Sequence, residues 1–112
     1  MGNTPKERFL GMLGLCVRAR RAQCGTQNVC DTLKVGRARI VVMASDNSPA
    51  TEKRLRDRTA FYRIELIETA LGASELGAAL GKSGPVAAVA ITDDSMAGAV
   101  KTAAERYSEQ ED

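Results

Sequence analysis

The stretch RRAQCGTQNVCDTLKVGRARIVVMASD, residues 20–46, carries the signals that decide the fold. Arg20–Cys24 reads as a short extended piece, and Gly25 breaks the chain before a helix predicted over Thr26–Val35. Arg39–Ala44 is a continuous apolar run after its first residue, which is typical of a strand buried on both faces. Such a strand needs helices over both sides of its sheet.

Helical periodicity also defines which sides of these elements face the core. Residues at helical spacing on one face are predicted to point inward. They are Phe9, Met12, Leu13 and Cys16 in the first helix, Val29, Cys30 and Leu33 in the second, and Met96, Val100, Ala103 and Ala104 in the last. Thr4 can cap the first helix, Pro5 suits its first position, and Gly36 is a stop for the second.

Strands and helices alternate along the rest of the chain. The other predicted helices cover 5–19, 49 to about 58 and 74–80, and a last one begins at residue 93, 94 or 95; the other predicted strands cover 64–69 and 85–92. Segments of these lengths in this order predict an α/β fold, a three-layer α/β/α sandwich with a small mixed sheet. We expect one domain over residues 1–107, followed by an acidic, frayed tail at 108–112.

Composition excludes several classes of function. The 112 residues include no histidine, and the apolar runs are too short to cross a bilayer. No segment resembles a signal peptide, so we expect a cytoplasmic protein with reduced thiols. Cys16, Cys24 and Cys30 lack the paired spacing of a zinc site, and we expect neither metal nor cofactor.

Catalytic and nucleotide-binding motifs are also weak. Gly81-Lys82-Ser83 resembles part of a phosphate-binding loop, but only three residues separate Gly77 from Gly81, where that loop has four. The adjacent acids Asp93 and Asp94 are better placed to cap a helix than to act as a catalytic pair. We therefore expect a protein that is not an enzyme.

Charge is distributed unevenly over the sequence. Residues 1–63 hold 13 Lys/Arg against 5 Asp/Glu, a local net charge of +8, whereas residues 64–112 hold 3 against 9, a net charge of −6. Charge runs are often only solvated surface. Ten of the first 13 basic residues are arginines, however, and the planar arginine fork suits phosphates and base edges, which favours a nucleic-acid partner.

The glycine turn offers a specific place for such a partner. The first turn of a helix has free N–H groups and a positive dipole end, which suit phosphate and base edges. Residues expected around this contact are Arg20, Arg21, Gly25, Thr26, Gln27, Asn28, Asp31 and Lys34, the last four on the outer helix face. The alternative is an ordinary helix cap with a polar, solvated face.

An ordered set of motifs resembles a known family. The set is Gly25–Asn28, Gly36–Asp46, Ser74–Gly77, Gly81-Lys82 and Val86–Ile91. It is similar to the kink-turn RNA-binding ribosomal-protein superfamily of archaeal L7Ae and eukaryotic L30e, and most similar to its small bacterial YlxQ-like members. The resemblance spans roughly residues 8–105. It implies an α/β/α sandwich and a non-enzymatic protein that binds a sharply bent RNA.

The resemblance also implies which residues contact that RNA. The Gly25–Asn28 turn would enter the groove at the bend, and Arg21 would reach phosphate. Thr69, Ala70, Leu71 and Gly72 would form a loop that shields a flipped-out base, with Leu71 as its best apolar cover. The family usually has Asn-Glu where this chain has Gln27-Asn28, and a lysine where it has Asp31, an acid that would repel phosphate.

Two functions from different classes follow from these observations. The first is a ribosome-associated protein that binds structured RNA, with ribosomal proteins as further candidate partners and a monomer as the expected state. The second is a protein-interaction module on the same scaffold that has lost most of its affinity for kink-turn RNA. The +8 half favours the first, and Asp31 with the acidic C-terminal half favours the second.

Overall fold

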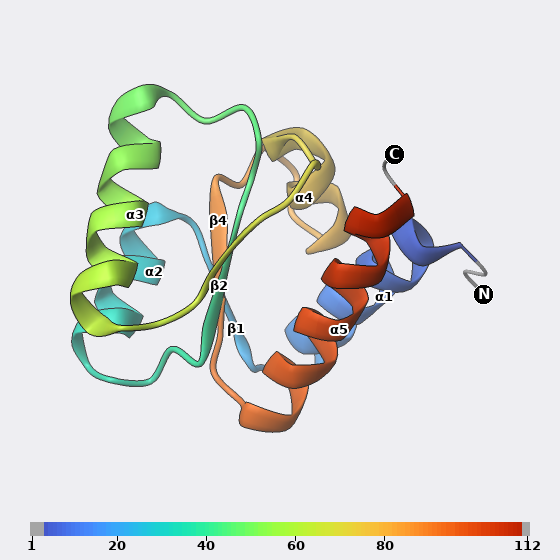
Figure 1. The fold of residues 1–112 in the computed structure, drawn as a ribbon, viewed down its shortest axis with the longest axis horizontal. Helices are drawn as coiled ribbons and strands as arrows, with labels where there is room; N and C mark the ends of the chain where they lie inside the picture. The colour runs from blue at the N-terminus through green and yellow to red at the C-terminus, as the bar shows by residue number, and fades with distance from the viewer. Residues whose placement is uncertain (1–3, 111–112) are drawn as a thin grey trace.

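The computed structural model of the chain describes residues 4–110 as alternating helices and strands (Figure 1). In chain order these are α1 (Pro5–Arg18), β1 (Ala22–Cys24), α2 (Thr26–Lys34), β2 (Ile40–Met43), α3 (Pro49–Tyr62), β3 (Leu66–Glu68), α4 (Ala73–Ala79), β4 (Ala88–Ile91) and α5 (Asp94–Gln110). The four strands form one sheet in the order β1-β4-β2-β3. β4 runs antiparallel to both β1 and β2, whereas β3 runs parallel to β2, so the sheet is mixed.

Helices cover both faces of this sheet. α2 and α3 lie on one face, and α1, α4 and α5 lie on the other (Figure 1). This confirms the predicted three-layer α/β/α sandwich with a small mixed sheet. Among residues 4–110, no helix is long and apolar enough to cross a membrane.

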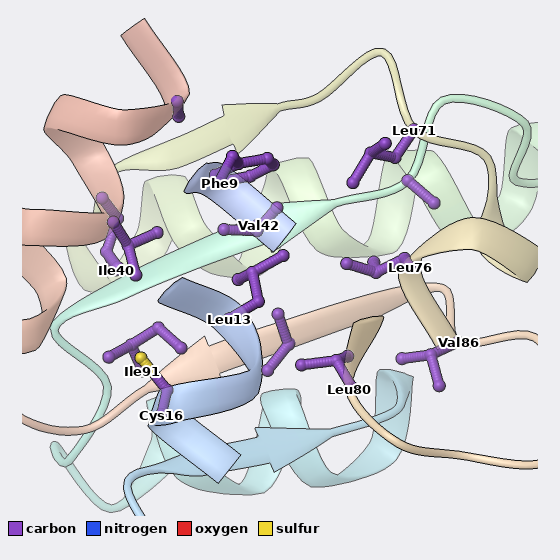
Figure 2. Close-up of a cluster of buried hydrophobic side chains, with 14 of the residues drawn as sticks. Phe9, Leu13, Cys16, Ile40, Val42, Leu71, Leu76, Leu80, Val86 and Ile91 are labelled. Carbon is purple, nitrogen blue, oxygen red and sulfur yellow. The ribbon is translucent and has the colours of Figure 1, made fainter. Parts of the chain in front are cut away.

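The two central strands contribute to two separate cores because their side chains alternate between the faces. In β2, Ile40 and Val42 belong to the cluster under α1 and α5, and Val41 and Met43 belong to the cluster under α2 and α3. Figure 2 shows the first cluster, in which Phe9, Leu13 and Cys16 of α1 pack over the sheet. All four β2 residues are buried, which confirms the prediction of a strand covered on both sides.

Helix ends follow the predicted signals in two places. Thr4 caps α1, since its hydroxyl accepts from the Glu7 N–H at 3.1 Å and the Glu7 carboxylate accepts from the Thr4 N–H at 3.2 Å. Gly36 ends the α2 region with a φ of +76°, a left-handed conformation that glycine adopts without steric cost.

Several boundaries differ from the prediction, each for a local reason. α3 continues one turn past Arg58 because Tyr62 packs against the core, and Arg63 ends it with a φ of +58°. The extended piece begins at Ala22 instead of Arg20, because Arg20 has a φ of +60° and lies in the turn after α1. β3 and β4 are shorter than predicted because flanking N–H groups of Ile64 and Val86 bond to helix carbonyls instead of strands.

The C-terminal helix also extends further than expected. α5 continues to Gln110, whereas a frayed tail was expected from residue 108; residues 111 and 112 lie outside the described residues. Tyr107 is buried, and its ring stacks on that of Phe9 at a centroid distance of 5.8 Å. This contact fixes the last turns of α5 against α1 and explains the longer helix.

Candidate nucleic-acid interface

Two segments predicted to contact RNA lie at the same end of the sheet, beyond the ends of its strands. β1, β2 and β3 all finish at this end, and β4 begins there. A series of backbone hydrogen bonds links Gly25 to the 69–72 loop across it: Gly25 N–H to Ala88 O at 2.8 Å, Ala44 N–H to Ala87 O at 2.9 Å and Ser45 N–H to Leu71 O at 2.8 Å. We call this end of the sheet, with residues 25–28, 44–47, 69–72 and 82–87, the Gly25 end.

Gly25 positions the start of α2 through its backbone. It adopts a φ of +97°, which side chains rarely tolerate, and no side chain accepts a hydrogen bond from the first turn of the helix. The N–H groups of Thr26, Gln27 and Asn28 are those that an α-helix leaves without an intrahelical acceptor. This turn can therefore offer several N–H donors and the positive helix end to an anionic or base-edge ligand.

Asp31 has a defined role on the outer face of α2. The Gln27 side-chain amide donates from Nε2 to Asp31 Oδ1 at 2.9 Å, and its Oε1 accepts from Arg54 of α3 at 3.0 Å. The acid thus orients the Gln27 amide and, through it, connects α2 to a cation on α3. Hydrogen bonds of this kind add a few tenths of a kcal/mol to helix stability, about 0.2–0.5 kcal/mol per pair.

Asn28 is exposed, and its side chain also stabilises the turn. Its Nδ2 donates to the Cys24 carbonyl at 2.8 Å, which connects the helix start to the end of β1. The Thr32 hydroxyl donates to the Asn28 carbonyl at 2.7 Å one turn later. The side-chain amide of Asn28 is therefore already bonded to the protein through one donor.

Residues that follow β2 anchor the 69–72 loop. Ser45 Oγ donates to the Ala70 carbonyl at 3.2 Å, and Asp46 Oδ1 accepts from the Ala73 N–H at 2.7 Å, where α4 begins. Gly72 is packed against the same carboxylate, because a Cβ there would lie 2.9 Å from Asp46 Oδ2. Sequence reasoning named the loop but not Ser45 and Asp46 as its anchors.

The expectation that Leu71 forms an apolar cover over a base does not fit its position. Its side chain is fully buried and points into the core near Leu76 (Figure 2). Thr69 is also buried, whereas Ala70 is exposed and Gly72 is partly exposed. Leu71 is the one large apolar residue of the loop, and burying it against the core fixes the loop; the exposed surface is supplied by Ala70 and the backbone.

A shallow depression lies beside the Gly25 turn. It has a volume of about 570 Å³ and is lined by β1, the start of α2 and the loop from Lys82 to Ala87. Lys82 N–H donates to Gly77 O at 2.9 Å, which confirms that Gly81-Lys82 forms a helix-end turn and not the start of a phosphate-binding helix. Lys82 lines this depression and Arg54 bonds to Gln27, so both cations lie near the turn, and sequence reasoning did not assign them to it.

Other predicted cations lie toward the opposite end of the strands. Arg20 and Arg21 precede β1, and the Arg21 carbonyl accepts from the Thr92 N–H at 2.9 Å, beyond the end of β4. Lys34 is the last residue of α2. Arg21 lies four residues before Gly25, about 13 Å away along an extended chain. The structure therefore does not bring Arg20, Arg21 and Lys34 into one cluster with the glycine turn.

The cysteines are free thiols packed in or near the core. Burial raises the pKa of Cys16 to about 11, with a further contribution from Asp93. Burial also raises the pKa of Cys24, against an opposing effect of Lys82. Both thiols are therefore protonated at neutral pH. Within the described part of the chain, no group of three Cys, Asp or Glu side chains could hold a metal ion.

Two bacterial proteins are similar to this chain in sequence. RNA-binding protein YlxQ of Bacillus subtilis (strain 168) is 33% identical over 86 residues, which cover 77% of this chain and 84% of that protein. RNA-binding protein YlxQ of Enterococcus faecium is 25% identical over 68 residues, covering 61% of this chain and 66% of that protein.

Solved structures share the fold. A protein of unknown function from Bacillus halodurans C superposes with a TM-score of 0.81 at 26% identity, over 88% of this chain and 97% of that one. A 15.5 kD RNA binding protein from Giardia lamblia superposes with a TM-score of 0.74 at 17% identity, over 94% and 88% of the two chains. Residues 8–100 match the family described as ribosomal protein L7Ae/L30e/S12e/Gadd45, and the chain belongs to that family.

Proposed function

We propose that this protein binds structured RNA through the Gly25 end and carries out no catalysis. The observation that carries the proposal is that the α2 start and the 69–72 loop lie at the same end of the sheet and are linked by backbone hydrogen bonds. The Gly25 end offers N–H donors from the α2 start, the Gln27 amide and two nearby cations, Arg54 and Lys82.

The RNA proposed here is sharply bent, of the kink-turn type, and belongs to the ribosome. The names of the two bacterial relatives and of the Giardia structure support RNA as the class of ligand. A bent RNA suits the site because it can present a widened groove to the Gly25 turn and an unstacked base to the 69–72 loop at once. Ribosomal proteins are further proposed partners, the protein acts as a monomer, and the compartment is the cytoplasm.

Affinity for RNA should depend steeply on salt. The N-terminal 63 residues carry a net charge of +8, and a contact with about five phosphates, which draws on cations of this half beyond those at the Gly25 end, gives a log–log slope near −4 to −5 on duplex-like RNA. Fluorescence anisotropy with a labelled bent RNA, at four salt concentrations between about 50 and 200 mM, measures the slope.

A straight duplex of the same length and composition is the control. Tighter binding to the bent RNA at every salt concentration supports recognition of shape. Equal affinities for both RNAs would leave only a non-specific electrostatic contact. No binding of either RNA at the lowest salt concentration would show the proposed function to be wrong.

Arg21→Ala should weaken RNA binding modestly without unfolding the domain. The side chain is exposed, and the Arg21 backbone makes its hydrogen bonds regardless of side chain. Lys82→Ala is the comparison, and it should weaken binding more because Lys82 lines the depression at the Gly25 turn. Anisotropy and thermal melting of both variants test this. If Arg21→Ala has the larger effect, the RNA extends toward the opposite end of the strands.

A second candidate function, a protein-interaction module, is favoured by a groove along the free edge of β3. It has a volume of about 540 Å³, and its lining residues include four glutamates, Glu52, Glu65, Glu68 and Glu105. Arg56 pairs with Glu52 and Glu68, and Lys101 pairs with Glu65. Hydrogen bonds from Arg56 lower the pKa of Glu68, so this carboxylate stays ionised. A basic, extended segment of a partner protein suits this groove.

The double variant Glu65→Gln/Glu105→Gln should then weaken binding of a labelled lysine-rich peptide.

A further inference from the structure

The end of the molecule opposite the Gly25 end carries an exposed aromatic ring among cations. Phe61 is 76% exposed at the end of α3, and Val35 is 67% exposed just after α2. They are two of the three large apolar side chains that residues 4–110 expose, the third being Leu15 at 44%. Neither residue is used by the proposed contact at the Gly25 end.

Chain topology brings these residues to the same end. α2 leads from the end of β1 to the start of β2, and α3 leads from the end of β2 to the start of β3, so both helices run away from the Gly25 end (Figure 1). The Val41 N–H donates to the Glu65 carbonyl at 3.0 Å, and Ala38 shares a core cluster with Ile64. The segments that follow the two helices therefore lie side by side.

Basic residues flank the exposed side chains in the sequence. Residues 32–40 contain three basic residues and no acid, and residues 58–64 contain two basic residues and no acid. Arg58 lies one helical turn before Phe61 and Tyr62, where side chains are neighbours. Lys34, Arg37, Arg58 and Arg63 form no ion pair with any residue that the structure describes, whereas Arg39 pairs with Asp94. We call Lys34, Val35, Arg37, Arg58, Phe61 and Arg63 the Phe61 surface.

Helix electrostatics explain only part of this surface. Cations at the C-terminal ends of α2 and α3 are stabilised by the negative helix end. That effect does not account for the 76% exposure of Phe61, whose ring forms an edge-to-face pair with that of Tyr62 at a centroid distance of 4.9 Å and an interplanar angle of 84°. An exposed aromatic ring close in sequence to cations without ion pairs suits single-stranded nucleic acid, which binds by base stacking and phosphate contacts.

We propose that the Phe61 surface is a second RNA contact, which binds a single-stranded segment with a base stacked on Phe61. This proposal rests on the proposed function, because it extends the same RNA beyond the Gly25 end. α3 contains 14 residues, about 21 Å of helix, and joins the two ends. That length corresponds to roughly six steps of a nucleic-acid strand at about 3.4 Å each, so one RNA can reach both ends.

The test compares one bent RNA with and without a single-stranded extension of about eight nucleotides. The extension should tighten binding to the wild-type protein about tenfold by anisotropy. Phe61→Ala should remove this gain and leave binding of the RNA without extension unchanged. Phe61→Trp should retain the gain and Phe61→Leu should lose it, since stacking needs an aromatic face and a simple apolar contact does not.

The cations are tested with a matched pair of double variants. Arg58→Gln/Arg63→Gln should reduce the gain and lower the magnitude of the salt slope by about 1.4, since each phosphate on a single strand contributes about 0.7. Arg8→Gln/Arg106→Gln removes two cations from α1 and α5 on the other face of the sheet and should leave the gain intact. Thermal melting checks that every variant is folded.

Three outcomes would overturn the proposal. One is no gain from the extension with the wild-type protein. Another is an equal loss of affinity of Phe61→Ala for both RNAs. The third is a change of sedimentation coefficient in Phe61→Ala, which would make this surface a contact between copies of the chain. Binding of the free eight-nucleotide strand, lost in Phe61→Ala, would support the Phe61 surface even if bent RNA does not bind the Gly25 end.

Discussion

Gly77→Ala should lower the free energy of unfolding by about 3 kcal/mol, at the upper end of the cost of overpacking. Gly77 is buried in α4, and a Cβ there would lie 2.1 Å from the Gly84 carbonyl oxygen and 3.1 Å from the Gly84 carbonyl carbon. Both atoms belong to the backbone, so no side-chain rotation can relieve the clash. The loop at 81–85 has to move away from α4, which also disturbs the depression beside the Gly25 turn.

Gly98→Ala is the matched control, because it makes the same chemical change within a helix. Gly98 is exposed in α5, and a Cβ there would contact nothing within 4 Å. Alanine is favoured over glycine in helix interiors, so this variant should gain about 0.5–1 kcal/mol. Urea unfolding monitored by circular dichroism compares both variants with the wild type. Equal stabilities of the Gly77→Ala variant and the wild type would show that the 81–85 loop does not pack on α4.

Asp31→Lys should tighten binding to a bent RNA by about tenfold or more. If the outer face of α2 meets RNA, the acid repels phosphate, and a lysine replaces this repulsion with attraction. The substitution also removes the acceptor of the Gln27 Nε2 donor, which frees this donor for the ligand. Because Asp31 is exposed, unfolding free energy should change by no more than about half a kcal/mol.

Two further variants separate the causes of that effect. Asp31→Asn removes the repulsion without adding a cation and should give part of the gain. Glu109→Lys makes the same change of net charge on α5, in the opposite layer, and should give little gain. Affinities are measured at one fixed salt concentration. An Asp31→Lys variant that binds RNA no more tightly than the wild type, but loses a basic protein partner, would favour the interaction module.

Most of the fold could be predicted because its elements are determined by local signals. The Thr4 cap, the glycine stop at Gly36 and the unbroken apolar run of β2 act within a few residues of the elements that they define. Helix ends were less predictable where a distant contact decides them. Tyr107 extends α5 by stacking on Phe9, which lies 98 residues earlier in the chain.

The candidate site was less predictable because its parts are assembled by the sheet. Sequence spacing placed Arg21 near Gly25, but β1 separates them, and the sheet instead brings Lys82 and Arg54 close to the turn. The family resemblance implied a surface role for Leu71, yet the loop places this side chain in the core. Which residue of the 69–72 loop is buried depends on hydrogen bonds from Ser45 and Asp46, which come from another part of the chain.

The strand order also constrains the time at which this protein can fold on the ribosome. β1 and β2 never pair with each other, and both require β4, the last strand in the chain, as their neighbour. Until residue 91 has been synthesised, the β2–β3 pair is the largest piece of the sheet that can form. A nascent chain that ends before Ala88 therefore exposes one edge of β2, and its hydrophobic strand remains open to misassociation or to a chaperone.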